Sequence, residues 1–405
     1  MSLSNHAPER PIIFDPSALV LLAAATLIIM ANAAISPALP ALEAKFYGNP
    51  HAGFLARMLV SAPSVTVVLF APIAGWACDR FGKKRQLLVG VTLFVLSGTV
   101  GSFLPSLEAI LASRLVLGLS LALVMTAQMA LIGDYFEGGR RASFMGLQSA
   151  AVNLSGFVFI AVAGGISAGN AQLAFLVYAL PLFLIPFALT FLSRDIPGER
   201  LNVQPLLNAG EGSRGSWVLS GFAAGTVSAI TVMLFFVMPT QLPFYYQSLG
   251  LDAASTTIYG LGALMITGGC VGLSYKAVQF RIGLAGVFAA GFLFMTVGYV
   301  VLGGADTVFS ALLGPTLIGA GYGLLKPNLV AFALSIAPAS RRGAISGFVT
   351  TGIFLGQIVS PLLSTPLIWN FGFSNGFYVA ALLLAILSAI SIVFKLELVR
   401  RLAVS

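Results

Sequence analysis

The chain has 405 residues, of which 58% are hydrophobic and only 8% are charged, with a formal net charge of +8. Because an average soluble protein carries about 25% charged residues, this composition excludes an ordinary soluble enzyme, a disordered chain and a secreted disulfide scaffold. Unbroken apolar runs, such as 17–34 and 173–192, have the length a helix needs to cross a hydrocarbon core about 30 Å thick. We therefore expect an all-α polytopic membrane protein.

The first apolar run follows residues 1–16, which include Glu9, Arg10 and Asp15 and show no cleavage-site pattern. We expect this run to be a retained helix rather than a signal peptide. Charge clusters and Gly, Pro and Asn punctuation divide the whole chain into twelve predicted transmembrane helices. Their approximate centres are Ile28, Val65, Phe94, Leu119, Leu154, Phe183, Val232, Met265, Phe292, Leu317, Phe354 and Leu384.

The longest polar stretch, residues 194–215, separates the sixth predicted helix from the seventh and has the composition of a linker. We therefore predict three parts: a six-helix bundle over residues 1–193, a cytoplasmic linker over 194–215, and a second six-helix bundle over 216–405. A shift of 201 residues superposes Arg80 and Gly82 on Arg281 and Gly283, Gly118 on Gly319, and Arg141 and Gly146 on Arg342 and Gly347. This register indicates two pseudo-symmetric bundles of the same topology.

The basic residues provide an orientation, because cytoplasmic loops of membrane proteins carry an excess of Lys and Arg. Seventeen of the 21 lie on one predicted side: Arg10, Arg80, Lys83, Lys84, Arg85, Arg140, Arg141, Arg194, Arg200, Arg214, Lys276, Arg281, Arg341, Arg342, Lys395, Arg400 and Arg401. We expect both termini to be cytoplasmic in a multi-pass protein of the inner (plasma) membrane. Since the positive charge is explained by orientation, we expect no nucleic-acid partner.

The loop after the second predicted helix contains a specific motif, Gly75-Trp-Ala-Cys-Asp79-Arg80-Phe-Gly82-Lys83-Lys84-Arg85. It matches the G-x-x-x-D-R-x-G-[RK]-[RK] loop of major facilitator superfamily transporters, which the chain resembles over nearly its whole length. Arg114-Leu-Val-Leu-Gly118 resembles a motif of the proton-coupled branches, and Ile35-Ser-Pro37-Ala-Leu-Pro40 is similar to the 12-helix drug–proton antiporters. The branch's G-x-x-x-G-P-x-x-G-G pattern is absent, since Phe157 follows Gly156.

The resemblance implies that this loop is a conformational latch that closes the cytoplasmic side. Asp79 would accept hydrogen bonds from the start of the eleventh helix, near Arg341 and Arg342, and Arg80 would pair with Asp134. Small Gly75 permits close helix approach, and Gly82 permits a turn conformation closed to bulkier residues. The remaining latch residues are Lys83 and Arg85. The alternative interpretation is a positively charged cytoplasmic loop with an incidental Asp79.

Two basic residues, Arg114 and Lys326, lie well inside predicted helices, and none of the 13 acidic residues lies at the middle of one. Each such cation costs about 2.5–3.5 kcal/mol on insertion scales, so it should face a wet cavity or a partner. Lys326 lies roughly 15 Å from the inner end of its helix, which exceeds the reach of a snorkelling Lys stem. We therefore expect both cations to face a central cavity and bind the negative group of a substrate, with Lys326 as the titrating element.

Uncharged polar residues at membrane depth are further substrate-binding candidates: Asn32, Gln128, Asn153 and Gln357. Their alternative role is hydrogen bonding between helices. Tyr245 and Tyr246, in the Pro239–Tyr246 segment that interrupts the seventh predicted helix, are candidate stacking ligands, or alternatively part of an interfacial aromatic belt.

Together these features predict a secondary active transporter, not an enzyme, that moves a small anionic or zwitterionic organic solute by alternating access. The resemblance favours efflux, with protons as coupling ion. We expect a monomer in lipid with no metal and no cofactor. The chain has no G-x-x-x-x-G-K-[ST] loop for ATP. One alternative is a broad multidrug–proton antiporter for lipophilic cations, which would ordinarily need a membrane-embedded acid. Another is a non-transporting sensor or scaffold on the same fold.

Overall fold

A computed structural model describes residues 14–136, 138–167, 169–192, 216–336 and 342–404, and within these ranges the chain is helical with no strand. The first half contains α1 (Pro16–Ala33), η2 (Ser36–Ala38), α2 (Leu39–Lys45), α3 (Ala52–Phe81), α4 (Lys83–Thr99), η3 (Val100–Ser102), α5 (Leu107–Tyr135), α6 (Gly138–Ser167), η4 (Ala171–Phe183) and α7 (Leu184–Phe191). The second half contains α8 (Ser216–Ser248), α9 (Ala253–Leu273), α10 (Tyr275–Gly303), α11 (Val308–Ile336) and α12 (Arg342–Val404).

Within the part of the chain that the structure describes, eleven helical stretches are long and apolar enough to cross a membrane. The sequence analysis predicts twelve, and the difference lies in α12, which runs for 63 residues. Gly372 interrupts α12 with φ 79° and ψ 167°, a conformation that residues with a Cβ rarely adopt. Each part of α12 on either side of Gly372 is long enough to span a membrane. Gly372 is therefore the point at which we divide α12 into the last two predicted helices.

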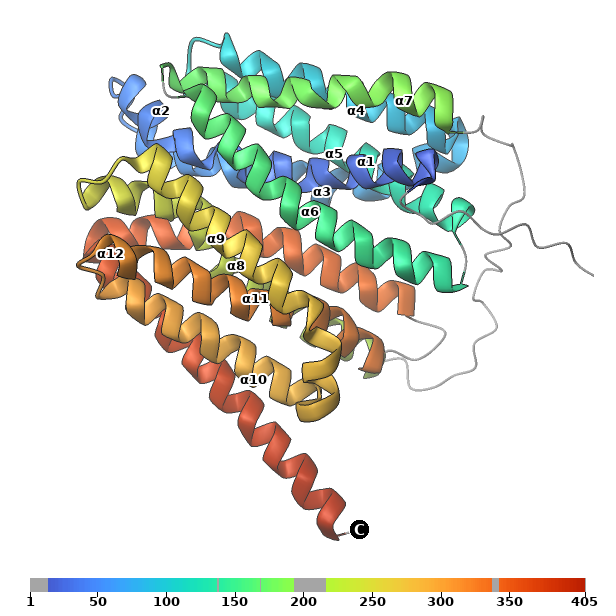
Figure 1. Cartoon of the computed structure of the whole chain (residues 1–405), viewed down its shortest axis with the longest axis vertical. Helices are drawn as coiled ribbons and strands as arrows, with labels where there is room; N and C mark the ends of the chain where they lie inside the picture. Colours follow the sequence, from blue (N-terminus) through green and yellow to red (C-terminus); the bar gives the residue numbers. More distant parts are fainter. Residues whose placement is uncertain (1–13, 137, 168, 193–215, 337–341, 405) are drawn as a thin grey trace, which may run out of the picture.

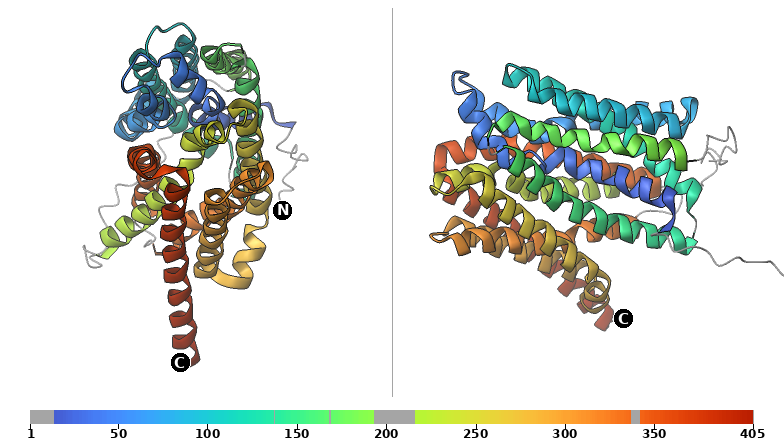
Figure 2. Two further views of the ribbon diagram at one scale, coloured as in Figure 1. Left: turned by 90° about the vertical axis from the view of Figure 1, so that its left-hand side faces the viewer. Right: turned by 45° about the horizontal axis from the view of Figure 1, so that its top comes forward.

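The helices of each half lie together, so that α1–α7 occupy the upper part of Figure 1 and α8–α12 the lower part. The view turned by 90° in Figure 2 shows the same division, with the last part of α12 leaving the bundle. The halves meet where α6 lies beside α9 and where the first part of α12 lies beside α3. We call the helix ends on the predicted cytoplasmic side inner and the opposite ends outer.

Short local signals set several helix ends. The Asp15 carboxylate accepts a hydrogen bond from the Ser17 amide (3.0 Å) at the start of α1, and the Ser106 hydroxyl accepts one from the Ala109 amide (3.2 Å) at the start of α5. Both are N-caps, which satisfy amides that have no partner inside the helix. Asp252 caps α9, and hydrogen bonds from the Ser255 side chain and backbone hold the pKa of Asp252 below its ordinary value.

The 201-residue register reappears in the packing. The Thr66 hydroxyl donates to the Leu115 carbonyl (2.7 Å) between α3 and α5, and the Thr267 hydroxyl donates to the Thr316 carbonyl (3.0 Å) between α9 and α11. Both pairs are separated by the same shift. Gly82 and Gly283, also related by this shift, have φ 93° and 71°. The two halves are thus built from the same local contacts.

Each of these helix pairs approaches closely over a glycine. A Cβ on Gly118 would collide with the Pro63 carbonyl and the Thr66 hydroxyl, and one on Gly319 would collide with the corresponding atoms of Leu264 and Thr267. Small residues let membrane helices approach closely in this way. The paired threonines and glycines therefore hold α3 to α5 and α9 to α11 with the same geometry.

Candidate functional site

Lys326 lies on α11, ten residues before the end of that helix at Ile336, or about 15 Å along its axis. Its side chain is exposed. Among the described residues it makes no hydrogen bond or ion pair, whereas Arg57, Lys83 and Arg140 each pair with an acid. Lys326 is thus an accessible cation at membrane depth, and its placement in a central cavity stays a prediction.

The helices around Lys326 are held together by small and aromatic residues. One turn away, Gly323 packs against the backbone of Gly268 on α9, and Tyr322 stacks on Phe235 of α8 with ring centroids 3.7 Å apart. Asn153 of α6 contacts the other side of α9, 3.5 Å from the position of a Cβ on Gly269. Gly323 and Tyr322 thus hold α11 to α9 and α8, and Asn153 brings α6 of the first half against α9.

Arg114 has a different environment from the one predicted. Its side chain is fully buried inside the first half. The guanidinium donates to the carbonyls of Leu59 (3.0 Å) and Ala31, and it lies 4.8 Å from the ring centroid of Tyr178. Arg114 thus joins α5 to α1, α3 and η4, while its Nη1 is buried with no hydrogen-bond partner among the described residues. The sequence could not reveal this arrangement, because the acceptor carbonyls belong to segments far away in the chain.

Three other candidate ligands are satisfied by backbone carbonyls. The Gln128 amide donates to Leu21 (2.8 Å), the Tyr245 hydroxyl to Leu302 (2.7 Å), and the Tyr246 hydroxyl to Ala311 (3.0 Å). All three side chains are buried. In this conformation they connect helices within one half.

Asn32 and Gln357 are brought together across the two halves. The Gln357 side-chain oxygen accepts hydrogen bonds from Asn32 (3.4 Å) and from the Ser64 hydroxyl. Ser64 lies near the middle of α3 and Gln357 near the middle of the first part of α12, and Asn32 lies near the end of α1, at the middle of the apolar stretch Pro16–Lys45. They therefore close the interface between the halves at membrane mid-depth.

A second contact between the halves lies further out and involves Arg57, which the sequence analysis does not single out as a site residue. Arg57 Nε donates to the Gln241 side-chain oxygen (2.9 Å), and its guanidinium lies 3.6 Å from the ring centroid of Phe244. On its own half Arg57 pairs with Glu43 (3.1 Å). The available sequence signal was its spacing, because Arg57, Ser61 and Ser64 lie on one face of α3.

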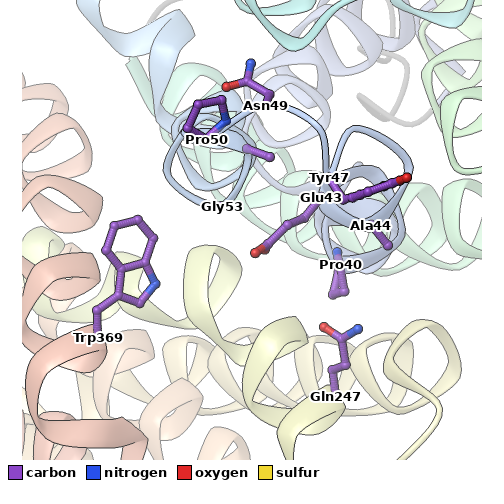
Figure 3. A pocket seen from close by; sticks show the side chains of 10 residues that line it. Pro40, Glu43, Ala44, Tyr47, Asn49, Pro50, Gly53, Gln247 and Trp369 are labelled. Atoms are coloured by element: carbon purple, nitrogen blue, oxygen red, sulfur yellow. The ribbon is translucent and has the colours of Figure 1, made fainter.

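The outer contact borders a surface pocket of about 450 Å³ (Figure 3). Its lining comes from both halves, with Glu43 and Tyr47 on one side and Gln247 and Trp369 on the other. Trp369 also lies 5.9 Å from the Arg57 guanidinium. The pocket therefore marks the outer end of the closed interface.

The latch residues are arranged differently from the expectation. Asp134 accepts its ion pair from Lys83 (2.6 Å), not from Arg80, whose guanidinium instead lies 5.6 Å from the Trp76 ring centroid. The prediction that Arg80 pairs with Asp134 is wrong in this conformation. Lys83 is the first residue of α4, next to the turn at Gly82 (φ 93°), and this turn directs Lys83 toward the end of α5.

The other latch residues show the inner side without close packing. A Cβ on Gly75 would meet no atom within 4 Å, so the expected close approach of helices is absent there. Asp79 and Arg85 are exposed. Arg341 lies outside the described residues, as does the side chain of Arg342. Near the inner ends of α6 and α12, Gly146 and Gly347 also face open space, whereas Gly221 near the start of α8 packs against Phe348.

Comparison with known proteins places this geometry in context. A family model described as Major Facilitator Superfamily matches residues 21–361. "Multidrug resistance protein 1" of Bacillus subtilis is 22% identical, covering 83% of this chain and 86% of that protein. "Quinolone resistance protein NorA" of Staphylococcus aureus is 24% identical, covering 76% and 79%.

Solved structures agree on the fold. A D-xylose–proton symporter has a TM-score of 0.73 at 16% identity, covering 92% of this chain and 97% of that one. A POT family transporter in complex with 5-aminolevulinic acid has a TM-score of 0.75 at 13% identity, covering 94% and 96%. At these identities the likeness extends to the fold alone.

Proposed function

The chain belongs to the major facilitator superfamily, and from this premise we propose that it exports a small organic solute whose negative group is held by Lys326. It is a multi-pass transporter of the inner membrane rather than an enzyme. Its substrate is a small molecule, and transport proceeds by alternating access around a site at mid-depth between the two halves.

The observation that carries the proposal is the environment of Lys326. It is an accessible cation at membrane depth, and among the described residues it has no acidic partner. Isolated charges inside a membrane protein are costly and are kept where they line a pathway or bind a ligand. A carboxylate or phosphate on the solute would supply the missing counter-charge. Asn153 of α6, which packs against Gly269 of α9, is a further candidate for hydrogen bonding to the solute.

The direction of transport is inferred from the relatives, whose names describe resistance to drugs and quinolones. The same names support a second candidate, a broad multidrug–proton antiporter for lipophilic cations. Against it, none of the 13 acidic residues in the sequence lies at the middle of a predicted helix. A lipophilic cation would therefore meet Lys326 without a carboxylate to offset the repulsion.

The two candidates are separated by neutralising Lys326 in purified protein reconstituted into proteoliposomes. We expect Lys326→Gln to reduce transport of a carboxylate-bearing quinolone at least tenfold. Lys276→Gln, which removes an exposed charge at the start of α10, is the matched control and should transport at the wild-type rate. Ethidium, a lipophilic cation, is measured in parallel.

Quinolone transport by Lys326→Gln at the wild-type rate would refute the role of Lys326. Wild-type transport of ethidium that survives Lys326→Gln would establish the second candidate. Absence of counterflow for every solute in a broad screen would favour the non-transporting sensor or scaffold.

A further inference from the structure

The outer pocket beside the Arg57 contact has a lining that suits one class of ligand (Figure 3). Of the ten residues that line it, Glu43 is the only charged one. The Glu43 side chain is 37% exposed, whereas its partner Arg57 is 5% exposed and does not line the pocket. The ion pair therefore presents its carboxylate to the pocket and its guanidinium to the protein interior.

One oxygen of this carboxylate is available to a ligand. Glu43 Oε2 accepts a hydrogen bond from Arg57 Nη1 (3.1 Å), and Oε1 accepts none from any residue that the structure describes. In Figure 3 the Glu43 carboxylate points toward the side of the pocket on which Trp369 lies. A ligand placed between Glu43 and Trp369 would therefore contact the carboxylate.

The neighbouring charged residues do not supply a competing cation to the pocket. Asn49, which lines the pocket, donates a hydrogen bond to the exposed Glu108 at the start of α5. The Lys45 ammonium is held by the side chains of Asn170 and Gln172. A surface recess with carboxylates at and behind its wall raises the local concentration of positively charged ligands.

Two aromatic rings complete the lining. Tyr47 is 88% exposed and Trp369 is 57% exposed, and both line the pocket. Aromatic faces attract cations, most strongly those of Trp, and they recognise ammonium groups that carry organic substituents. A metal ion would instead need several oxygen ligands. One carboxylate beside two aromatic rings is therefore a lining for an organic ammonium ion.

We propose that the outer pocket binds a small organic ammonium ion from the outside, with its positive group between Glu43 and Trp369. Gln247 and Trp369 belong to the second half, and the rest of the lining belongs to the first. A ligand that contacts both halves favours the conformation in which their outer ends lie together, so the bound cation slows export. Binding is independent of the proposed function, and only the effect on export rests on it.

The binding test uses the fluorescence of Trp369 in purified protein. The chain contains three tryptophans, so Trp76→Phe combined with Trp217→Phe leaves Trp369 as the reporter. The probe is choline, and the matched neutral compound is 3,3-dimethylbutan-1-ol, which has a similar shape without the charge. A protein that keeps only Trp76, near the inner end of α3, controls for effects unrelated to the pocket.

We expect choline to change the Trp369 emission saturably and the neutral alcohol to leave it unchanged. Glu43→Gln should weaken the affinity for choline at least tenfold. Asp306→Asn, which removes another exposed acid, is the matched control and should bind choline as tightly as the parent. Tyr47→Leu leaves the Arg57–Glu43 pair in place and should weaken binding several-fold, which keeps the site testable if Glu43→Gln folds poorly.

The effect on export is measured separately in right-side-out vesicles. External choline should slow solute counterflow by the wild-type protein at least twofold and should leave counterflow by Glu43→Gln unchanged. Saturable binding of choline with unchanged wild-type counterflow would overturn the effect on export.

Three results would overturn the site itself: no saturable response of Trp369, an equal response to the neutral alcohol, or an unchanged affinity in Glu43→Gln. If the wild-type protein shows counterflow of no solute, the proposed function fails, and the fluorescence titration still decides whether the pocket binds an ammonium ion.

Discussion

The two halves of the chain share their packing contacts but not the cations that lie at membrane depth. Thr66 and Gly118 in the first half make the same contacts as Thr267 and Gly319 in the second. The two cations at membrane depth, Arg114 and Lys326, do not follow this register. Arg114 corresponds to Pro315, and Lys326 corresponds to Met125. The contacts between helices are therefore repeated in both halves, whereas Arg114 and Lys326 each occur in one half only. The two halves differ at these positions, where the 201-residue repeat is not kept.

The two cations also differ in what satisfies them. Arg114 is fully buried and donates to carbonyls of two neighbouring helices, whereas Lys326 is accessible and, within the described residues, unpaired. A cation with backbone acceptors contributes to holding its helices together. A cation without any acceptor is available for a ligand. This comparison predicts that the two residues fail in different ways when they are replaced.

The largest effect on stability is expected for Arg114→Ala. The substitution leaves the Leu59 and Ala31 carbonyls unsatisfied and opens a cavity beneath Tyr178, at a cost of about 3–5 kcal/mol. Thermal unfolding in detergent should show a strongly lowered Tm and little folded protein. Lys326→Gln, by contrast, should keep the wild-type Tm. Equal losses of Tm in both variants would contradict the distinction between a structural and a ligand-binding cation.

Some of this architecture could be predicted from the sequence. Helix positions followed from the length of apolar runs, and the depth of Lys326 followed from counting residues along its helix. The turn at Gly82 followed from its place between a helix end and a basic run, and it has positive φ as expected. These features depend only on local sequence. The division of α12 at Gly372 was less visible because helix continues on both sides of that residue.

Contacts between distant segments could not be read in the same way. No sequence pattern near Arg114 indicates that the carbonyls of Leu59 and Ala31 accept its hydrogen bonds. The partners of Arg57, Gln241 and Phe244, lie in the other half, and no residue near Arg57 in the sequence indicates them. Which of the neighbouring Arg80 and Lys83 reaches Asp134 depends on the turn between α3 and α4. The tertiary structure, and not the local sequence, determines which of these side chains contact one another.

A smaller effect should test whether the halves are equivalent as scaffolds. Gly118→Ala and Gly319→Ala each place a methyl group against backbone and threonine atoms of the neighbouring helix. Overpacking of this kind typically costs about 1–3 kcal/mol, and we expect similar decreases in Tm for the two variants. Gly146→Ala is the matched control, because its methyl group would meet no atom within 4 Å. A decrease in Tm for only one of the two variants would show that the corresponding contacts do not stabilise the two halves equally.

The smallest effect concerns a contact that the second half does not repeat. The Lys83–Asp134 ion pair joins α4 to the end of α5, but the corresponding positions are Leu284 and Ser335. Because both side chains are partly exposed, we expect a coupling of about 0.2–1 kcal/mol that weakens as salt screens it.

A double-mutant cycle of Lys83→Met and Asp134→Asn, read out by thermal unfolding, measures this coupling. The matched cycle with Arg80→Met should give no coupling if the protein adopts the conformation described above, because Arg80 then lies over Trp76 instead. Coupling of Asp134 to Arg80 but not to Lys83 would mean that the dominant conformation in solution has the latch arranged as the family motif implies. The cycle therefore reports whether Asp134 pairs with Lys83 or with Arg80 in the purified protein. The second half cannot form an equivalent ion pair, because Leu284 and Ser335 stand at the corresponding positions.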